Sequence, residues 1–235
     1  MIEIAGTSFE RDQLCAPTLV YDFKSAPISD FIDQSGYNAD DDVVEGVTLL
    51  HDEVRDTISY SVFNVPLDTN LSATEVVLER VGFCLHKSIL FVAVCRRIGV
   101  PAVLCSDVVT NHVSDDLMRT LVGGDRFLHW YTRVYIDGKW VKAAPIFNSL
   151  LCNLYGIDVV DFNVDADDIR QEDQGGKRMQ YDGNEKIYID PSMDELLSEI
   201  QDHHPLMVTS RGRTPSTYQL QSSRQSNEGG SQNVE

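Results

Sequence analysis

Cys84 and His129 are the two side chains in this sequence whose types and positions suit nucleophilic catalysis. Cys84 follows Gly82-Phe83 and begins a run that predicts a helix to Ile98. A thiol in the first turn of a helix faces unpaired backbone N–H groups and the positive end of the helix dipole, which favour the thiolate and lower the thiol pKa. The same N–H groups can stabilise an oxyanion, so this position suits a nucleophile of acyl transfer.

The base for this thiol must come from another segment of the chain. His86 is two residues further along the predicted helix, a rotation of about 200° that directs it away from Cys84. We therefore expect His86 to have a packing or surface role. His129 lies on a predicted strand, and a rigid sheet could present its imidazole to the end of the helix.

A tight hairpin is predicted around Asp137-Gly138, because β-rich runs flank this dipeptide and it favours a type I′ turn. A two-residue turn fixes the register of the strands and places His129 opposite Ile146. Side chains alternate between the faces of a strand, so Ala144 and Asn148 are the predicted diagonal neighbours of His129 on its own face.

The other predicted elements surround the helix that carries Cys84. Apolar residues at spacings of three and four predict an amphipathic helix over Val43–Ile58. The helix from Cys84 is apolar on all sides and ends at Gly99, so we expect it to be central. The remaining expectations are a strand at Ala102–Cys105, a polar loop at Asn111–Asp125, a strand at Lys186–Ile189 and a helix at Ser192–Ile200.

Several motifs in this order resemble the transglutaminase-like superfamily: Gly82-Phe83-Cys84, then Arg97–Ala102, then His129, an Asp-Gly turn and Trp140. The resemblance covers roughly residues 43–148. It implies an α+β fold with a papain-like core, in which a central helix carries the cysteine and packs against an antiparallel sheet. It also implies a Cys, His, Asp triad, with no metal or other cofactor.

The third member of this triad departs from the family pattern. Ala144 stands where the family has Asp, before Pro145, and an alanine cannot orient an imidazole. The string from Trp140 to Asn148 is similar to a microbial subgroup, and there Asn148 becomes the candidate, because an amide oxygen can accept an imidazole N–H. An ordinary turn residue at Asn148 is the equal alternative.

Composition limits the size, partners and location of the protein. We expect a transglutaminase-like domain over 43–205, an N-terminal lead-in or cap over 1–42 and a disordered polar tail over 206–235. A net charge of −18 disfavours nucleic acid as a partner. Five cysteines without a Cys-x-x-Cys pair argue against a zinc ribbon or a secreted disulfide scaffold, and no segment predicts a signal peptide or a membrane span. These features favour a cytoplasmic protein.

The sequence therefore predicts cysteine-dependent acyl transfer on an amide substrate of peptide or glutamine type. The reaction would pass through a thioester and end in hydrolysis or transamidation. Ala144 favours an alternative, in which a catalytically inactive domain binds a peptide or a partner protein. A purely structural α+β domain is the third possibility. The sequence leaves the oligomeric state open.

Overall fold

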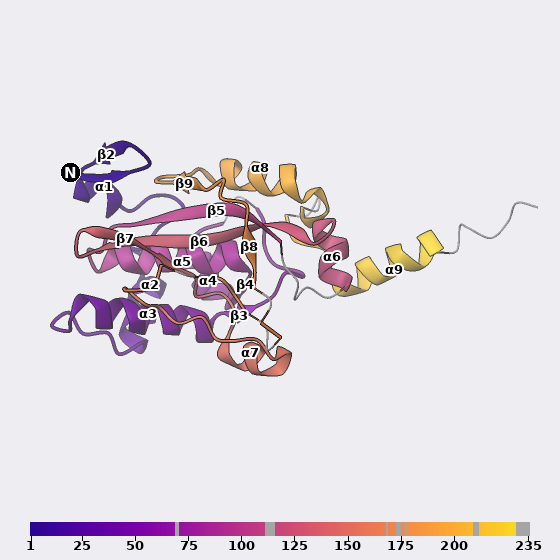
Figure 1. Cartoon of the computed structure of the whole chain (residues 1–235), viewed down its shortest axis with the longest axis horizontal. Helices are drawn as coiled ribbons and strands as arrows, with labels where there is room; N and C mark the ends of the chain where they lie inside the picture. Colours follow the sequence, from indigo (N-terminus) through magenta and orange to yellow (C-terminus); the bar gives the residue numbers. More distant parts are fainter. Residues whose placement is uncertain are drawn as a thin grey trace, which may run out of the picture.

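The computed structural model describes residues 1–68, 71–110, 116–167, 169–172, 175–176, 178–208 and 212–228. An antiparallel sheet lies at its centre, with β5 (Ala102–Thr110) between β6 (Arg126–Ile136) and the short strands β8 (Gln180–Tyr181) and β9 (Lys186–Tyr188) (Figure 1). β7 (Lys139–Ala143) pairs with the other side of β6. The predicted strand at 102–105 is therefore the first part of a longer one.

The β6–β7 hairpin has the predicted turn. Ile136 pairs with Lys139, and both turn residues have the positive φ that a type I′ turn requires, +50° at Asp137 and +81° at Gly138. This turn fixes which residues of β7 lie opposite which residues of β6.

The hairpin is shorter than predicted. Its last pair is Thr132 with Ala143, so the predicted pairing of His129 with Ile146 is wrong. Pro145 has no N–H to donate to the ladder, and the Ile146 N–H bonds to the Ala144 carbonyl instead.

Helix α5 (Cys84–Arg97) is the central element, as predicted. It packs on the sheet face that carries Thr132, whose hydroxyl donates to the Ser88 carbonyl at 3.4 Å. Helices α3 (Val43–Thr57) and α4 (Ala73–Glu79) contact α5, and α2 (Ala26–Gln34) packs on α4, so α5 is enclosed between the sheet and other helices (Figure 1). The predicted α+β class, with a central helix against an antiparallel sheet, is confirmed.

The predicted C-terminal helix is also present and runs further than expected, with Ser192 as its N-cap accepting from the Glu195 N–H. The expected polar loop at 111–125 contains a helix, α6, and residues 111–115 lie outside the described part of the chain. The remaining elements are β1 (Ile2–Ile4), β2 (Thr7–Phe9), α1 (Arg11–Leu14), β3 (Ser59–Tyr60), β4 (Val81–Gly82), α6 (Asp116–Val122), α7 (Ser149–Tyr155), α8 (Met193–His203), the 3₁₀ helix η1 (Pro205–Met207) and α9 (Thr217–Glu228).

Both ends of the chain are structured beyond what composition suggests. In the expected lead-in, Arg11 donates to the Gly99 carbonyl at 2.6 Å, which joins this segment to the end of α5. In the expected disordered tail, Met207 and Leu220 are buried and the Thr214 hydroxyl accepts from the Val65 N–H at 2.7 Å. These contacts join part of the polar segment to the core, while α9 extends away from the body (Figure 1). Residues 209–211 and 229–235 of that tail lie outside the described residues.

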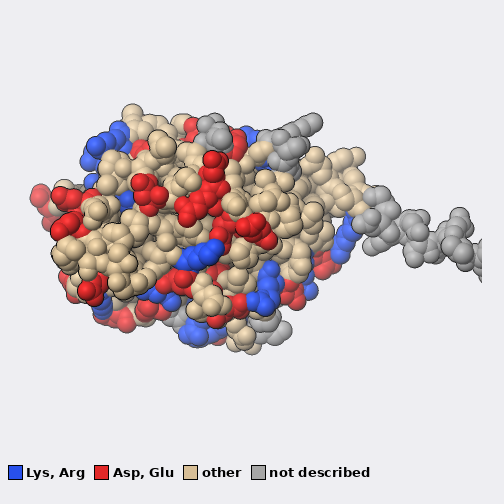
Figure 2. Space-filling view, turned by 90° about the horizontal axis from the view of Figure 1, so that it is seen from above, with Lys and Arg blue, Asp and Glu red and all other residues tan. Residues whose placement is uncertain are grey.

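The excess of negative charge is carried at the surface. Figure 2 shows acidic side chains spread over one face, with basic ones interspersed among them. Within the described part of the chain, none of the helices has both the length and the apolar character needed to cross a bilayer.

Candidate active site at the start of α5

Cys84 is the first residue of α5 and follows the N-cap Phe83. Its side chain is buried, with 4% of the residue exposed. Gly82 makes this entry into the helix possible, because a Cβ at that position would lie 2.4 Å from Cβ of His86. A glycine is therefore needed two residues before Cys84, because a side chain there would collide with His86.

His86 points away from the thiol, as predicted. Its Nε2 lies 2.7 Å from the Pro66 carbonyl oxygen, and its ring packs edge-on against Phe83 with centroids 4.6 Å apart. Burial lowers the pKa of His86 to about 4. His86 thus has a packing role and stays neutral near pH 7.

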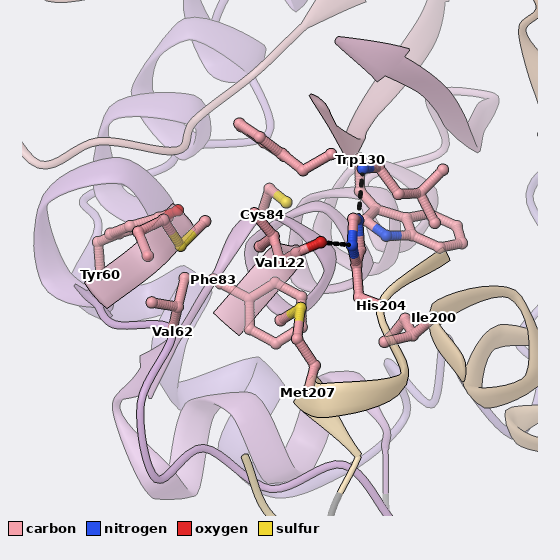
Figure 3. Close-up of a pocket in the computed structure, with 12 residues that line it drawn as sticks. Tyr60, Val62, Phe83, Cys84, Val122, Trp130, Ile200, His204 and Met207 are labelled. Carbon is pink, nitrogen blue, oxygen red and sulfur yellow. Dashed lines mark hydrogen bonds between the residues drawn. The ribbon is translucent and has the colours of Figure 1, made fainter. Parts of the chain in front are cut away.

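Cys84 lines a small, mostly apolar cavity (Figure 3). The cavity lies between β3, the start of α5, α6, β6 and the α8–η1 segment. Its apolar walls include Val62, Phe83, Val122, Trp130, Ile200 and Met207. None of the described residues that line it is an acid, a lysine or an arginine.

Burial has the largest effect on the pKa of the Cys84 thiol. It raises the pKa of Cys84 to about 12, although the backbone N–H groups of Trp130, Leu85 and Cys84 itself act to lower it. The helix start therefore supplies the expected donors, but the expected net lowering of the pKa is absent from this closed arrangement. The reason is the apolar cavity, which sequence position alone does not reveal.

His129 lies on the other face of β6. Its ring lines a second small cavity, with Ala144, Gln171 and Met179 among the walls. His129 Nδ1 and the Tyr181 hydroxyl are 3.1 Å apart and hydrogen-bonded. Burial lowers the pKa of His129 to about 4, so the ring is neutral near pH 7.

Cys84 lies near the backbone of β6 next to His129, whereas the imidazole ring of His129 lies on the other face of that strand. The Trp130 N–H that acts on the sulfur belongs to the peptide joining His129 to Trp130. Consecutive side chains of a strand point to opposite faces, and Trp130 takes the face of the Cys84 cavity. The hydrogen bonds of the described residues include none between Cys84 and His129.

Asn148 has a different set of partners from the one predicted. Its Oδ1 accepts from the Tyr60 N–H at 2.9 Å, and its Nδ2 donates to the carbonyls of Arg55 and Ile58. Buried Lys87 donates to the same two carbonyls at 2.7 and 2.8 Å. These contacts tie the end of α3 to β3, and they occupy the amide that was expected to orient His129.

Asp107 and Tyr181 are neighbours of His129 that sequence reasoning missed. Asp107 is directly opposite His129 in the β5–β6 ladder, and its carboxylate accepts from the N–H groups of Val108, Gly183 and Asn184 at 2.8 to 3.2 Å. Tyr181 reaches His129 from β8 on the far side of β5. Neither residue carries a local motif, because the sheet brings together segments far apart in sequence.

His204 is a further missed residue, on the wall of the Cys84 cavity (Figure 3). Its Nε2 accepts from the Leu128 N–H at 2.8 Å and its Nδ1 lies 2.9 Å from the Val122 carbonyl. This assigns the ring proton to Nδ1 and leaves both nitrogens engaged with backbone, so His204 fastens the α8–η1 segment to β6 and α6. Among the described residues, no three His, Cys, Asp or Glu side chains gather closely enough to hold a metal ion.

Comparison with known proteins places this site in a family. Residues 31–145, which include Cys84, His129 and Ala144 but not Asn148, match the model of the transglutaminase-like superfamily. A solved structure described as a "Putative Cysteine Protease from Cytophaga hutchinsonii" is 18% identical with a TM-score of 0.44, over 79% of this chain and 56% of that one. A "putative protease from Parabacteroides distasonis" is 13% identical with a TM-score of 0.35, over 73% of this chain and 30% of that one.

The chain thus spans about half the length of the first of these structures and under a third of the second. Comparison with curated protein sequences finds no match. The central helix with Cys84 at its start, the antiparallel sheet and the matched residues agree with one another. The match to the transglutaminase-like superfamily is carried by residues 31–145, which hold both Cys84 and His129.

Proposed function

We propose that this domain performs cysteine-dependent acyl transfer on an amide of a peptide or protein, with Cys84 as the nucleophile. The sulfur attacks the amide carbonyl, the amine leaves, and the resulting thioester passes its acyl group to water or to another amine. The observation that carries the proposal is the position of the thiol at the start of α5, where the backbone N–H groups of Trp130 and Leu85 act to lower its pKa.

These N–H groups support both steps of the reaction. The first-turn amides of α5 have no carbonyl partner within the helix, so they can donate to a substrate oxygen. As the sulfur attacks, negative charge develops on that oxygen, and amides already in place stabilise it without reorganisation. A low-dielectric cavity strengthens this interaction.

His129 is the proposed base. Its neutral ring can take the thiol proton and return it to the leaving amine. For this transfer the ring must leave the Tyr181 hydroxyl and turn towards the sulfur, past the peptide that it shares with Trp130. Asp107, which pairs with His129 in the β5–β6 ladder, is a carboxylate on the strand beside this base, and backbone N–H groups hold it in place.

The second candidate function is binding of a peptide or partner protein by an inactive domain. Two observations favour it: Ala144 replaces the family carboxylate, and the Asn148 amide is occupied by the Tyr60 backbone. A base without an orienting partner is a weak catalyst. The buried thiol, with its pKa raised to about 12, is inert until the site opens.

Trapping the thioester separates the two functions. The protein is incubated with an activated ester as acyl donor, and intact mass spectrometry follows the acyl adduct and its release by hydroxylamine. Acyl transfer predicts an adduct that maps to Cys84, is absent from Cys84→Ala and persists in Cys152→Ala, a control at another buried thiol. An adduct of equal extent in Cys84→Ala would contradict the proposal, and its absence from the wild type would favour the binding function.

A further inference from the structure

The cavity beside Cys84 has one polar end and otherwise apolar walls. At the polar end lie the sulfur and the N–H groups of Leu85 and Trp130. Phe83, Trp130 and Met207 are among the apolar walls. His204 contributes no free donor or acceptor, because its two nitrogens already bond to the Leu128 N–H and the Val122 carbonyl.

We propose that this cavity selects acyl groups that are uncharged and apolar, so that the favoured substrate has the form R–CO–X with a small aliphatic or aromatic R. This inference rests on the proposed function, since it places the reacting carbonyl at the Cys84 sulfur. R then extends towards Phe83 and Met207. The assignment narrows the substrate class from amides in general to those with an apolar acyl side.

The cost of burying a charge decides the selectivity. A carboxylate or an ammonium on R would lose its hydration in a cavity whose described walls offer no opposite charge. An apolar R removes hydrocarbon surface from water and gains about 25 cal/mol for each Å² buried. Both effects act in the same direction, so charged acyl groups are excluded while apolar ones are retained.

Met207 is one of the apolar residues that line the cavity. It is buried and comes from η1, which follows the His204 attachment directly. Its neighbour Leu206 lies in the same 3₁₀ helix but is 56% exposed and does not line the cavity. Met207→Ala and Leu206→Ala are therefore a matched pair, in which one change enlarges the cavity and the other does not.

The covalent test uses two acyl donors with the same leaving group, the hexanoyl and succinyl thioesters of N-acetylcysteamine, of which the succinyl group carries a charged carboxylate. In both, the Cys84 sulfur forms a bond to the carbonyl carbon, the thiolate of N-acetylcysteamine leaves with the electron pair, and the proton of the Cys84 thiol passes through the base to this thiolate. Rates at Cys84 are divided by those of a free cysteine derivative with each reagent. We expect the normalised rate to be about tenfold higher for the hexanoyl reagent, a ratio that corresponds to about 1.4 kcal/mol.

The matched variants test where the preference originates. Met207→Ala should change the ratio by at least about threefold, whereas Leu206→Ala should leave it within error. Equal normalised rates for the two reagents in the wild type would overturn the inference while leaving acyl transfer intact. A preference that is the same in Met207→Ala would also overturn it.

A non-covalent test separates the inference from the proposed function. Hexanamide and succinamic acid carry no leaving group, and each is added to the Cys84→Ala protein while its melting temperature is measured. If Cys84 proves unreactive, stabilisation by hexanamide alone, weakened by Met207→Ala, would retain the apolar site as a binding site. No shift with hexanamide, or an equal shift with both compounds, would overturn it.

Discussion

Cys84, at the start of α5, and Trp130, on β6, line the same cavity, and the Trp130 backbone N–H acts against burial to lower the pKa of the thiol. The start of α5 therefore lies against the strand that also carries His129. The imidazole is turned to the other face of the strand, where it bonds to Tyr181. In this structure the thiol is buried and the imidazole is hydrogen-bonded to Tyr181.

Tyr181 is expected to restrain His129. Tyr181→Phe removes the hydroxyl 3.1 Å from Nδ1 and frees the ring to turn, so the alkylation rate of Cys84 at pH 7 should rise about threefold to tenfold. Tyr188→Phe is the control, because its hydroxyl bonds to Ser106 in the same sheet. Peptide mapping after timed iodoacetamide treatment measures the rate, and an equal rate in both variants would show that Tyr181 does not restrain the ring.

Asn148 is expected to stabilise the fold. Asn148→Ala removes donors to the carbonyls of Arg55 and Ile58 and the acceptor of the Tyr60 N–H, and should lower the free energy of unfolding by about 2–4 kcal/mol. Asn153→Ala, an exposed change in α7, should have little effect. Urea denaturation measures both. Unchanged stability together with lost acylation would restore Asn148 to the catalytic role predicted from sequence.

Gly82 is expected to be required for the start of α5. In Gly82→Ala the new Cβ would lie 2.4 Å from Cβ of His86, which is part of the helix and cannot move alone. The shift should cost about 1–3 kcal/mol of stability and displace Cys84 from its amide donors. Thermal unfolding and the acylation assay report the two effects. If Gly82→Ala keeps both its stability and its acylation activity, the backbone around residue 82 can move enough in solution to accommodate the new Cβ.

The buried histidines predict a loss of stability in mild acid. The pKa values of His86 and His129 are about 4 in the folded protein against 6.5 for the exposed side chain. Between these values the unfolded chain binds more protons, so stability is fully present above pH 6.5 and falls as the pH drops towards 4. Each histidine contributes at most about 3 kcal/mol to this loss.

Urea midpoints measured from pH 7 to pH 4 test that loss. His86→Gln should flatten the slope between pH 6.5 and 4, because the side chain no longer titrates. His203→Gln changes an exposed histidine and should leave the slope as in the wild type. If His86→Gln keeps the full slope, burial of His86 is not its cause.

The local elements of this fold could be predicted because their causes lie in short stretches of sequence. The Asp137-Gly138 turn fixed the hairpin, and the apolar run after Cys84 marked the central helix. The end of β7 was misjudged, although Pro145 stood in the sequence as a residue that cannot donate to the ladder.

The surroundings of the site could not be predicted in the same way. Strands that are distant in the sequence pair in the sheet, and this pairing places Asp107 and Tyr181 beside His129. The C-terminal segment packs against the start of α5, which places His204 on the wall of the Cys84 cavity. The raised pKa of Cys84 depends on the apolar cavity that these segments close, whereas the position of the thiol on its helix suggested the opposite shift.

The most direct test of the proposed Cys84–His129 pair is the rate of Cys84 alkylation by iodoacetamide at pH 7, compared between the wild type and His129→Gln. If His129 takes the thiol proton, Cys84 should react faster than a model cysteine peptide, and His129→Gln should slow it by about tenfold or more. His203→Gln should leave the rate unchanged. A Cys84 rate at or below that of the model peptide, and equal in His129→Gln, would contradict the account.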